Sequence, residues 1–216
     1  NSSDVNNYLN KKLRKDAITL RELVASGKTS AEIQKVKEGF LQEIYNFLAI
    51  SLGNPPTVFD FEYRDEDKNY HIERKLTPQS FYEKYIGVNL DDYISIINAP
   101  TQDKPFNRSY TVEMLGNVVG GKEVRYLNVD MATFKKLAMT QLEQGESIWF
   151  GCDVGQSSTR DTGIMATEAF DVNDVFDIDF EMTKAQRLDY GESLMTHAMV
   201  LTGVDIVDGE PTKWKV

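Results

Sequence analysis

The chain has 216 residues, of which 41% are hydrophobic and 27% charged, the balance of an ordinary water-soluble globular protein. No apolar run approaches the roughly 18 to 20 residues of a membrane-spanning helix. A single cysteine, Cys152, excludes an internal disulfide framework and suits a reducing, cytoplasmic setting. Residues 1–90 hold 13 basic and 13 acidic side chains and residues 91–216 hold 11 and 21, so the second stretch carries the whole net charge of −10. Such an acidic surface argues against binding nucleic acid through its phosphate backbone.

The first third of the chain has the pattern of two amphipathic helices. Apolar residues recur at three- and four-residue intervals over residues 5–24, and Gly27 then provides a helix stop. Thr29 followed by Glu32 forms a capping box for a second helix, whose apolar stripe covers residues 33–48. The pattern predicts a helical hairpin.

After these helices, the spacing of apolar residues changes from that of a helix to that of a strand. Alternating aromatic and aliphatic residues over 57–76 enclose the polar tip 65–68, which predicts a β-hairpin with a solvated end. Thr77 and Pro78 then begin a short helix. A shift in composition and charge near residue 88 indicates a domain boundary at that point.

The remainder of the chain is predicted to consist mainly of strands, with one helix over residues 131–144. The expected strands cover residues 93–97, 112–115, 124–129, 147–152 and 198–204. We therefore expect an α+β protein with two parts. Residues 1–88 would form a subdomain of a helical hairpin and a β-hairpin, and residues 89–216 a β-rich half-domain.

Residues 116–122 match most of a phosphate-binding loop, glycine-x4-glycine-lysine. The next position should be a serine or threonine that binds magnesium, but it holds Glu123, whose charge would repel phosphate. The loop should also open a helix, whereas a strand is expected here. We expect a glycine turn between strands rather than a nucleotide site.

The other candidate ligands and nucleophiles have simpler interpretations. Cys152 ends an expected strand instead of starting a helix, so we expect a buried structural thiol. His71 and His197 are far apart in the sequence, and the acidic stretch 171–181 lacks the glycine and terminal glutamate of a calcium-binding EF-hand loop. No metal and no cofactor are expected.

His197 opens an apolar strand that ends in glycine, and a strand with a tryptophan follows at 212–216. This arrangement resembles the histidine-bearing half of papain-like cysteine peptidases. Within them, the bleomycin hydrolase and bacterial aminopeptidase C group is most similar. The likeness covers nearly the whole chain, and its specific points are residues 77–82, 116–121, 149–155 and 196–199.

The resemblance implies a cytoplasmic cysteine aminopeptidase that acts on peptides and assembles as a homohexamer. It implies that His197 is the catalytic base, that Thr196 and Ala198 border the substrate cleft, and that 1–88 is a helical insertion. The family's nucleophilic cysteine and oxyanion glutamine have no counterpart here. Its orienting asparagine would follow Val216. We therefore expect an inactive fragment of a larger enzyme.

Two other functions remain open from the residues. Taken alone, a histidine such as His197 is more often structural than catalytic, so the chain could be a non-catalytic interaction or assembly module. That module would self-associate without peptidase activity. A carbohydrate- or phosphate-handling enzyme built on the acidic half would instead bind a sugar, phosphate or metal.

Overall fold

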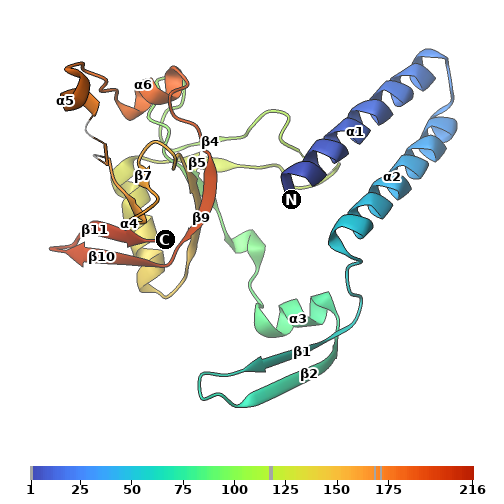
Figure 1. Ribbon diagram of the computed structural model, residues 1–216, viewed down its shortest axis with the longest axis horizontal. Helices are drawn as coiled ribbons and strands as arrows, with labels where there is room; N and C mark the ends of the chain where they lie inside the picture. Colours follow the sequence, from blue (N-terminus) through green and yellow to red (C-terminus); the bar gives the residue numbers. More distant parts are fainter. Residues whose placement is uncertain (1, 117–118, 168, 171) are drawn as a thin grey trace. The chain divides into compact units, whose positions relative to one another are not determined.

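The structure is a computed structural model that describes residues 2–116, 119–167, 169–170 and 172–216 (Figure 1). The chain divides into two compact units, Asn1–Val88 and Asn89–Val216. The first unit contains α1 (Ser2–Ala25), α2 (Ser30–Leu52), β1 (Phe59–Arg64), β2 (Tyr70–Leu76) and α3 (Pro78–Tyr85). No helix in the described ranges combines the length and apolarity needed to cross a membrane.

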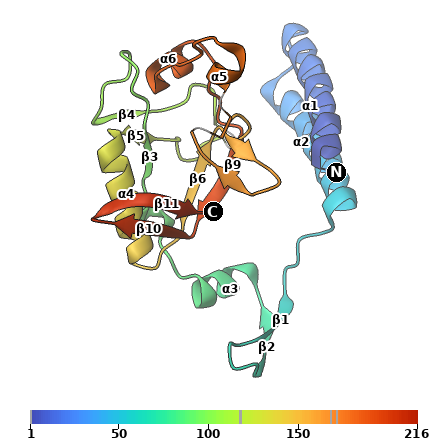
Figure 2. The same cartoon turned by 60° about the vertical axis from the view of Figure 1, so that its left-hand side comes forward.

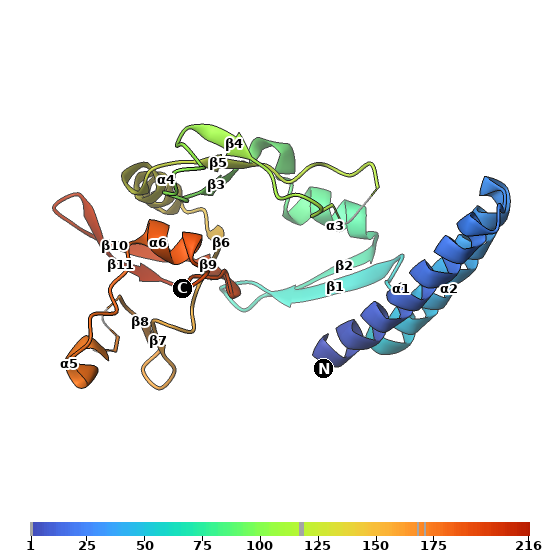
Figure 3. The same cartoon turned by 90° about the horizontal axis from the view of Figure 1, so that it is seen from above.

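Helices α1 and α2 lie side by side as the predicted hairpin (Figure 3). Gly27 ends the first helix with a φ of +76°, a left-handed conformation that glycine adopts without steric cost. The predicted capping box is present at the start of α2. The Thr29 hydroxyl accepts from the Glu32 amide, and the Thr29 amide donates to the Glu32 carboxylate over 2.9 Å.

A charged network lies among the apolar stripes of the two helices. Asp16 is the one residue of α1 that is buried, and Lys12 Nζ lies 2.5 Å from its carboxylate and 2.7 Å from that of Glu43. Desolvation lowers the pKa of Lys12, but its hydrogen bonds to both carboxylates outweigh this and raise the pKa overall. Most residues of the apolar stripes are only half-buried, and Leu13 and Val24 are exposed. The ion network therefore adds a specific contact between the helices.

Strands β1 and β2 pair antiparallel, and α3 packs against the hairpin through aromatic rings. The Phe61 ring lies 5.0 Å from that of Phe81 and 5.2 Å from that of Tyr85, both edge-to-face. At the polar tip, Asp65 accepts hydrogen bonds from the Asn69 amide and the His71 ring. The β-hairpin and the short helix are where the sequence predicts them.

The second unit contains a larger set of short elements. They are the 3-10 helix η1 (Leu90–Asp92), β3 (Ser95–Ile97), β4 (Arg108–Tyr110), β5 (Tyr126–Asn128), α4 (Met131–Glu143), β6 (Ile148–Cys152), β7 (Ser158–Thr159), β8 (Ile164–Met165), α5 (Val172–Phe176), α6 (Lys184–Asp189), β9 (His197–Leu201), β10 (Gly203–Val207) and β11 (Glu210–Lys215). Strand β5 is central to a three-stranded sheet, parallel to β3 and antiparallel to β4.

A buried asparagine, Asn128, holds this sheet to the loop between β3 and β4. The Asn128 amide group donates to the carbonyls of Ala99 and Lys104, and its side-chain oxygen accepts from the Ala99 amide. The prediction of a strand at 112–115 is wrong. Met114 has a φ of +60°, which an extended strand does not allow, and the strand lies earlier, at β4.

Helix α4 contacts β6 and β10, and β6 pairs antiparallel with β9 (Figure 2). The single strand expected over 198–204 is divided at Thr202, whose amide donates to the Lys215 carbonyl over 2.9 Å. The chain therefore changes partner there: β9 pairs with β6, and β10 pairs with β11. The sequence does not predict this switch, because both strands have the same apolar pattern.

Candidate active site around His197

His197 is the first residue of β9 and pairs across the ladder with Cys152, the last residue of β6. Side chains alternate between the two faces of a strand, so His197 shares a face with Met199 and Leu201. Those two side chains are half-buried, whereas His197 is exposed. The imidazole of His197 is therefore accessible to solvent, at the end of a strand face whose other side chains are half-buried.

Thr196 and Ala198, the two residues expected to border a substrate cleft, flank this imidazole. The Thr196 amide donates to the Cys152 carbonyl over 3.1 Å, and its hydroxyl accepts from the Val154 amide over 3.2 Å. Ala198 pairs with Gly151 on the exposed face of the ladder, opposite to the face of His197. The threonine hydroxyl is therefore held by the backbone of the neighbouring loop.

The residues just before His197 are attached to the loop that follows β6. The Leu194 amide donates to Asp153 Oδ2 over 3.3 Å. Gln156 Nε2 donates to the same carboxylate oxygen over 3.0 Å and to the Glu192 carbonyl over 2.5 Å. Sequence reasoning did not single out Asp153 or Gln156, although Asp153 lies within the 149–155 motif that supports the family resemblance.

Gly151 makes room for one more contact with this segment. A Cβ atom on Gly151 would lie 2.5 Å from Met195 Sδ, closer than real Cβ atoms approach, and 3.0 Å from Met195 Cγ, which is a tight contact. The Met195 side chain therefore lies over Gly151 of β6, close to the start of β9 where His197 lies.

Cys152 has the surroundings of an unreactive thiol. Its side chain is half-buried, and burial raises the pKa of the thiol, with the neighbouring Asp153 carboxylate raising it further. Only the thiolate is a good nucleophile, and the raised pKa keeps this thiol mostly protonated and slow to react at neutral pH. A thiol in this state does not suit the nucleophile of a cysteine–histidine pair.

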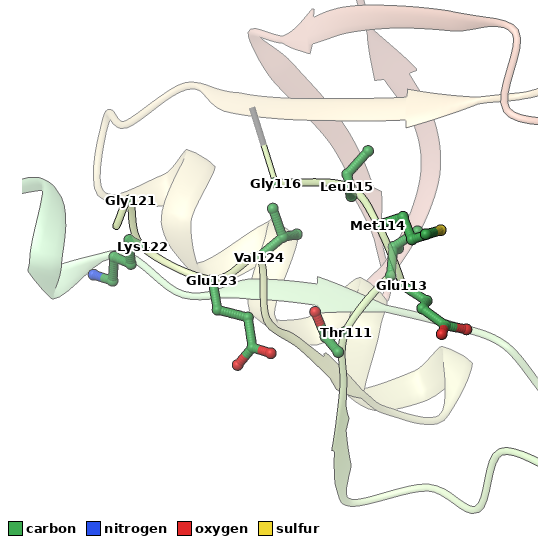
Figure 4. A pocket seen from close by; sticks show the side chains of 10 residues that line it. Thr111, Glu113, Met114, Leu115, Gly116, Gly121, Lys122, Glu123 and Val124 are labelled. Carbon is green, nitrogen blue, oxygen red and sulfur yellow. The ribbon is translucent and has the colours of Figure 1, made fainter. Parts of the chain in front are cut away.

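The glycine-rich turn lines a hollow of about 430 Å³ formed by residues 111–116 and 121–124 (Figure 4). Two positions of the candidate phosphate-binding loop, 117 and 118, lie outside the described residues. Glu113 and Glu123 line the hollow, and Lys122 Nζ lies 2.5 Å from the Asp91 carboxylate. Two carboxylates and a paired lysine do not suit a phosphate ligand.

The second unit, an α+β unit that presents His197 at the start of an antiparallel strand, has the fold of the histidine-bearing part of papain-like cysteine peptidases. The whole chain, residues 1–216, matches the model of the Peptidase C1-like family, and it belongs to that family. Within the described ranges, no three histidine, cysteine, aspartate or glutamate side chains are grouped so that they could hold a metal ion.

Relatives with assigned names cover the full chain. Aminopeptidase C of Streptococcus thermophilus is 59% identical over 217 residues, which are 100% of this chain and 49% of that protein. Aminopeptidase C of Lactococcus lactis subsp. cremoris is 55% identical over 218 residues, again 100% of this chain and 49% of that protein. The chain thus spans about half the length of the curated relatives it matches.

A solved structure supports the same assignment. The crystal structure of PepW from Lactobacillus rhamnosis HN001 superposes with a TM-score of 0.95 and is 67% identical. It covers 99% of this chain, and this chain covers 48% of it. At this identity, the likeness extends beyond fold class to the arrangement of individual strands.

Proposed function

We propose that the full-length protein containing this chain is a cysteine aminopeptidase, with His197 as its general base and acid. The observation that supports this most directly is the exposed imidazole at the start of β9 in a chain of the Peptidase C1-like family. Removal of N-terminal residues from peptides is inferred from the name aminopeptidase C, which the relatives carry over this whole chain.

The proposed reaction needs a second group that this chain does not provide. The Cys152 thiol is held protonated, so the nucleophile is a cysteine in the remainder of the protein. His197 accepts that thiol's proton, and the thiolate attacks the scissile carbonyl. The imidazolium then gives its proton to the leaving amine as the peptide bond breaks. Water releases the acyl group, with His197 again accepting a proton.

Thr196 and Ala198 are proposed to contact the substrate beside the reacting bond. The hydrogen bond from the Val154 amide fixes the Thr196 hydroxyl, and the Thr196 amide donates to the Cys152 carbonyl, so the methyl group of Thr196 is the part available to a peptide. Ala198 is exposed and small, and would leave room for a substrate side chain. The acidic net charge of −10 suits a peptide's free amino terminus better than nucleic acid.

Assembly and location are part of the same proposal. We propose a cytoplasmic homo-oligomer, the hexamer that the family resemblance implies. Helix α2 exposes 52% of Leu41, 51% of Tyr45 and 75% of Leu52, at a spacing that puts them on one face of the helix. An exposed apolar row of this kind favours a contact with another surface. The same row supports the alternative function, a non-catalytic assembly module.

Substrates with free and blocked N-termini distinguish these proposals. The full-length protein should release a fluorogenic amine from aminoacyl substrates but not from N-acetylated ones, and a thiol-alkylating reagent should abolish release. Turnover of both substrates would indicate an endopeptidase. A stable oligomer with no turnover of either would support the assembly module.

A further inference from the structure

The position of His197 depends on the backbone on either side of it. Within the described residues, no hydrogen bond reaches its imidazole ring. The β6–β9 register ends at the Cys152↔His197 pair, and beyond it the Thr196 amide donates to the Cys152 carbonyl over 3.1 Å. The end of a strand opens more easily than its centre, so further contacts beyond this pair help to fix the imidazole.

The loop after β6 supplies further support. Asp153 and Gln156 hold residues 192–194 through two hydrogen bonds, from the Leu194 amide to Asp153 Oδ2 and from Gln156 Nε2 to the Glu192 carbonyl. A third hydrogen bond, from Gln156 Nε2 to Asp153 Oδ2, joins the two side chains. A hydrogen bond to an ionised carboxylate is roughly twice as strong as one between neutral groups. The two loops therefore continue the contact between the strands beyond the last ladder pair.

We infer that Asp153 and Gln156 are positioning residues that fix the segment preceding His197 and hence the place of the imidazole in the active site. The inference rests on the proposed function, since it concerns how the proposed base is held. Their side chains hydrogen-bond to the backbone of Glu192 and Leu194, and so act on the segment before His197. A displacement of about 1 Å at a reacting group can cost about a hundredfold in rate.

Variants of Asp153 separate geometry from charge. In the full-length enzyme, Asp153→Ala should lower kcat by about 10- to 100-fold with little change in KM. Asp153→Asn keeps a carbonyl oxygen that can accept both hydrogen bonds, so it should restore most of kcat. Both variants remove the carboxylate charge next to Cys152 and should speed alkylation of that thiol equally, as followed by peptide mapping.

Matched variants complete the test. Asp161→Ala removes an exposed carboxylate from the loop between β7 and β8 and should leave kcat unchanged. Gln156→Ala removes two of the three hydrogen bonds at an exposed position and should lower kcat by about 3- to 10-fold. If Asp153→Ala does not fold, the kcat of Gln156→Ala tests the inference instead.

Failure of this inference differs from failure of the proposed function. If wild type is inactive, or His197→Ala remains active, the proposed function is wrong. If wild type is active and His197→Ala is not, the positioning role is contradicted by folded Asp153→Ala or Gln156→Ala enzyme with kcat within twofold of wild type. Equal loss in Asp153→Asn and Asp153→Ala would also overturn it, because the effect would then come from charge.

Discussion

Cys152 and His197 lie opposite each other at the open end of the β6–β9 ladder, the thiol half-buried and the imidazole exposed. In a catalytic cysteine–histidine pair, the histidine stabilises a thiolate of lowered pKa. Burial and Asp153 instead raise the pKa of the thiol. The two side chains therefore have separate roles, one structural and one proposed for proton transfer.

Cys152 should react slowly with thiol reagents while the protein is folded. Its raised pKa keeps the thiolate fraction small at neutral pH, and the rate should rise about tenfold with each pH unit and still be rising above the ordinary value of 9.0. Alkylation rates measured by peptide mapping between pH 6 and 10, with protein unfolded in urea as the control, check this. Labelling of folded Cys152 at pH 7 as fast as in urea would show that the thiol is not protected.

Thr29→Ala should destabilise the helical hairpin by about 1 kcal/mol, because it removes the hydroxyl that accepts from the Glu32 amide. Thr29→Ser keeps that hydroxyl and should cost much less, which makes it the matched control. Urea unfolding followed by circular dichroism gives both values. Equal losses in the two variants would mean that the capping hydrogen bond is not what stabilises α2.

Lys184 should make stability rise with pH in the alkaline range. Burial, helped by the nearby Arg187 charge, lowers the pKa of Lys184 from its ordinary 10.5 in the folded state. Between the lowered value and 10.5, the unfolded chain binds more protons at this site, so the free energy of unfolding increases with pH there. Below that window both states are protonated and the folded state bears the full cost of the buried charge.

The Lys184→Met variant isolates this effect. The difference in unfolding free energy between wild type and variant, measured from pH 8 to 10.5, should move in favour of wild type as pH rises. A difference that stays constant over this range would contradict the lowered pKa. The variant also removes the 2.8 Å hydrogen bond from Lys184 Nζ to Asn98. This loss changes the free-energy difference by the same amount at every pH and leaves its slope against pH unchanged.

Long periodic elements and helix caps could be predicted from the sequence. The helical hairpin has two long apolar stripes with a capping box at Thr29, and α4 has one stripe and an aspartate cap at Asp130. Helix α6 was missed because six residues give too little periodicity, although Thr183 and Gln186 form a capping box that could have revealed it. Two-residue strands such as β7 are too short to show any alternation of polar and apolar residues.

The candidate site was predicted only in part for a related reason. His197 is recognisable because a polar residue opens an apolar strand within a family motif. The contacts of Gln156 with Glu192 and of Asp153 with Leu194 join residues 36 and 41 positions apart, and no local pattern reveals such pairings. The ion network of Lys12, Asp16 and Glu43 was missed because charged residues beside an apolar stripe are usually interpreted as solvated.

The 216-residue polypeptide by itself should have no aminopeptidase activity. Its one thiol is Cys152, and a base without an ionisable nucleophile cannot form an acyl-enzyme. Aminoacyl fluorogenic substrates incubated with the purified polypeptide should show only the background rate of hydrolysis. Turnover that His197→Ala abolishes would contradict this, because the chain would then contain its own nucleophile.

The central claim is that His197 is the catalytic base, and the His197→Ala variant of the full-length enzyme tests it most directly. One imidazole both takes the thiol proton and protonates the leaving amine, so the variant should lose at least about a thousandfold in kcat/KM on aminoacyl substrates. Its melting temperature should match wild type, because His197 is exposed and its truncation opens no cavity. Near-normal turnover at an unchanged melting temperature would contradict the assignment of His197 as the base.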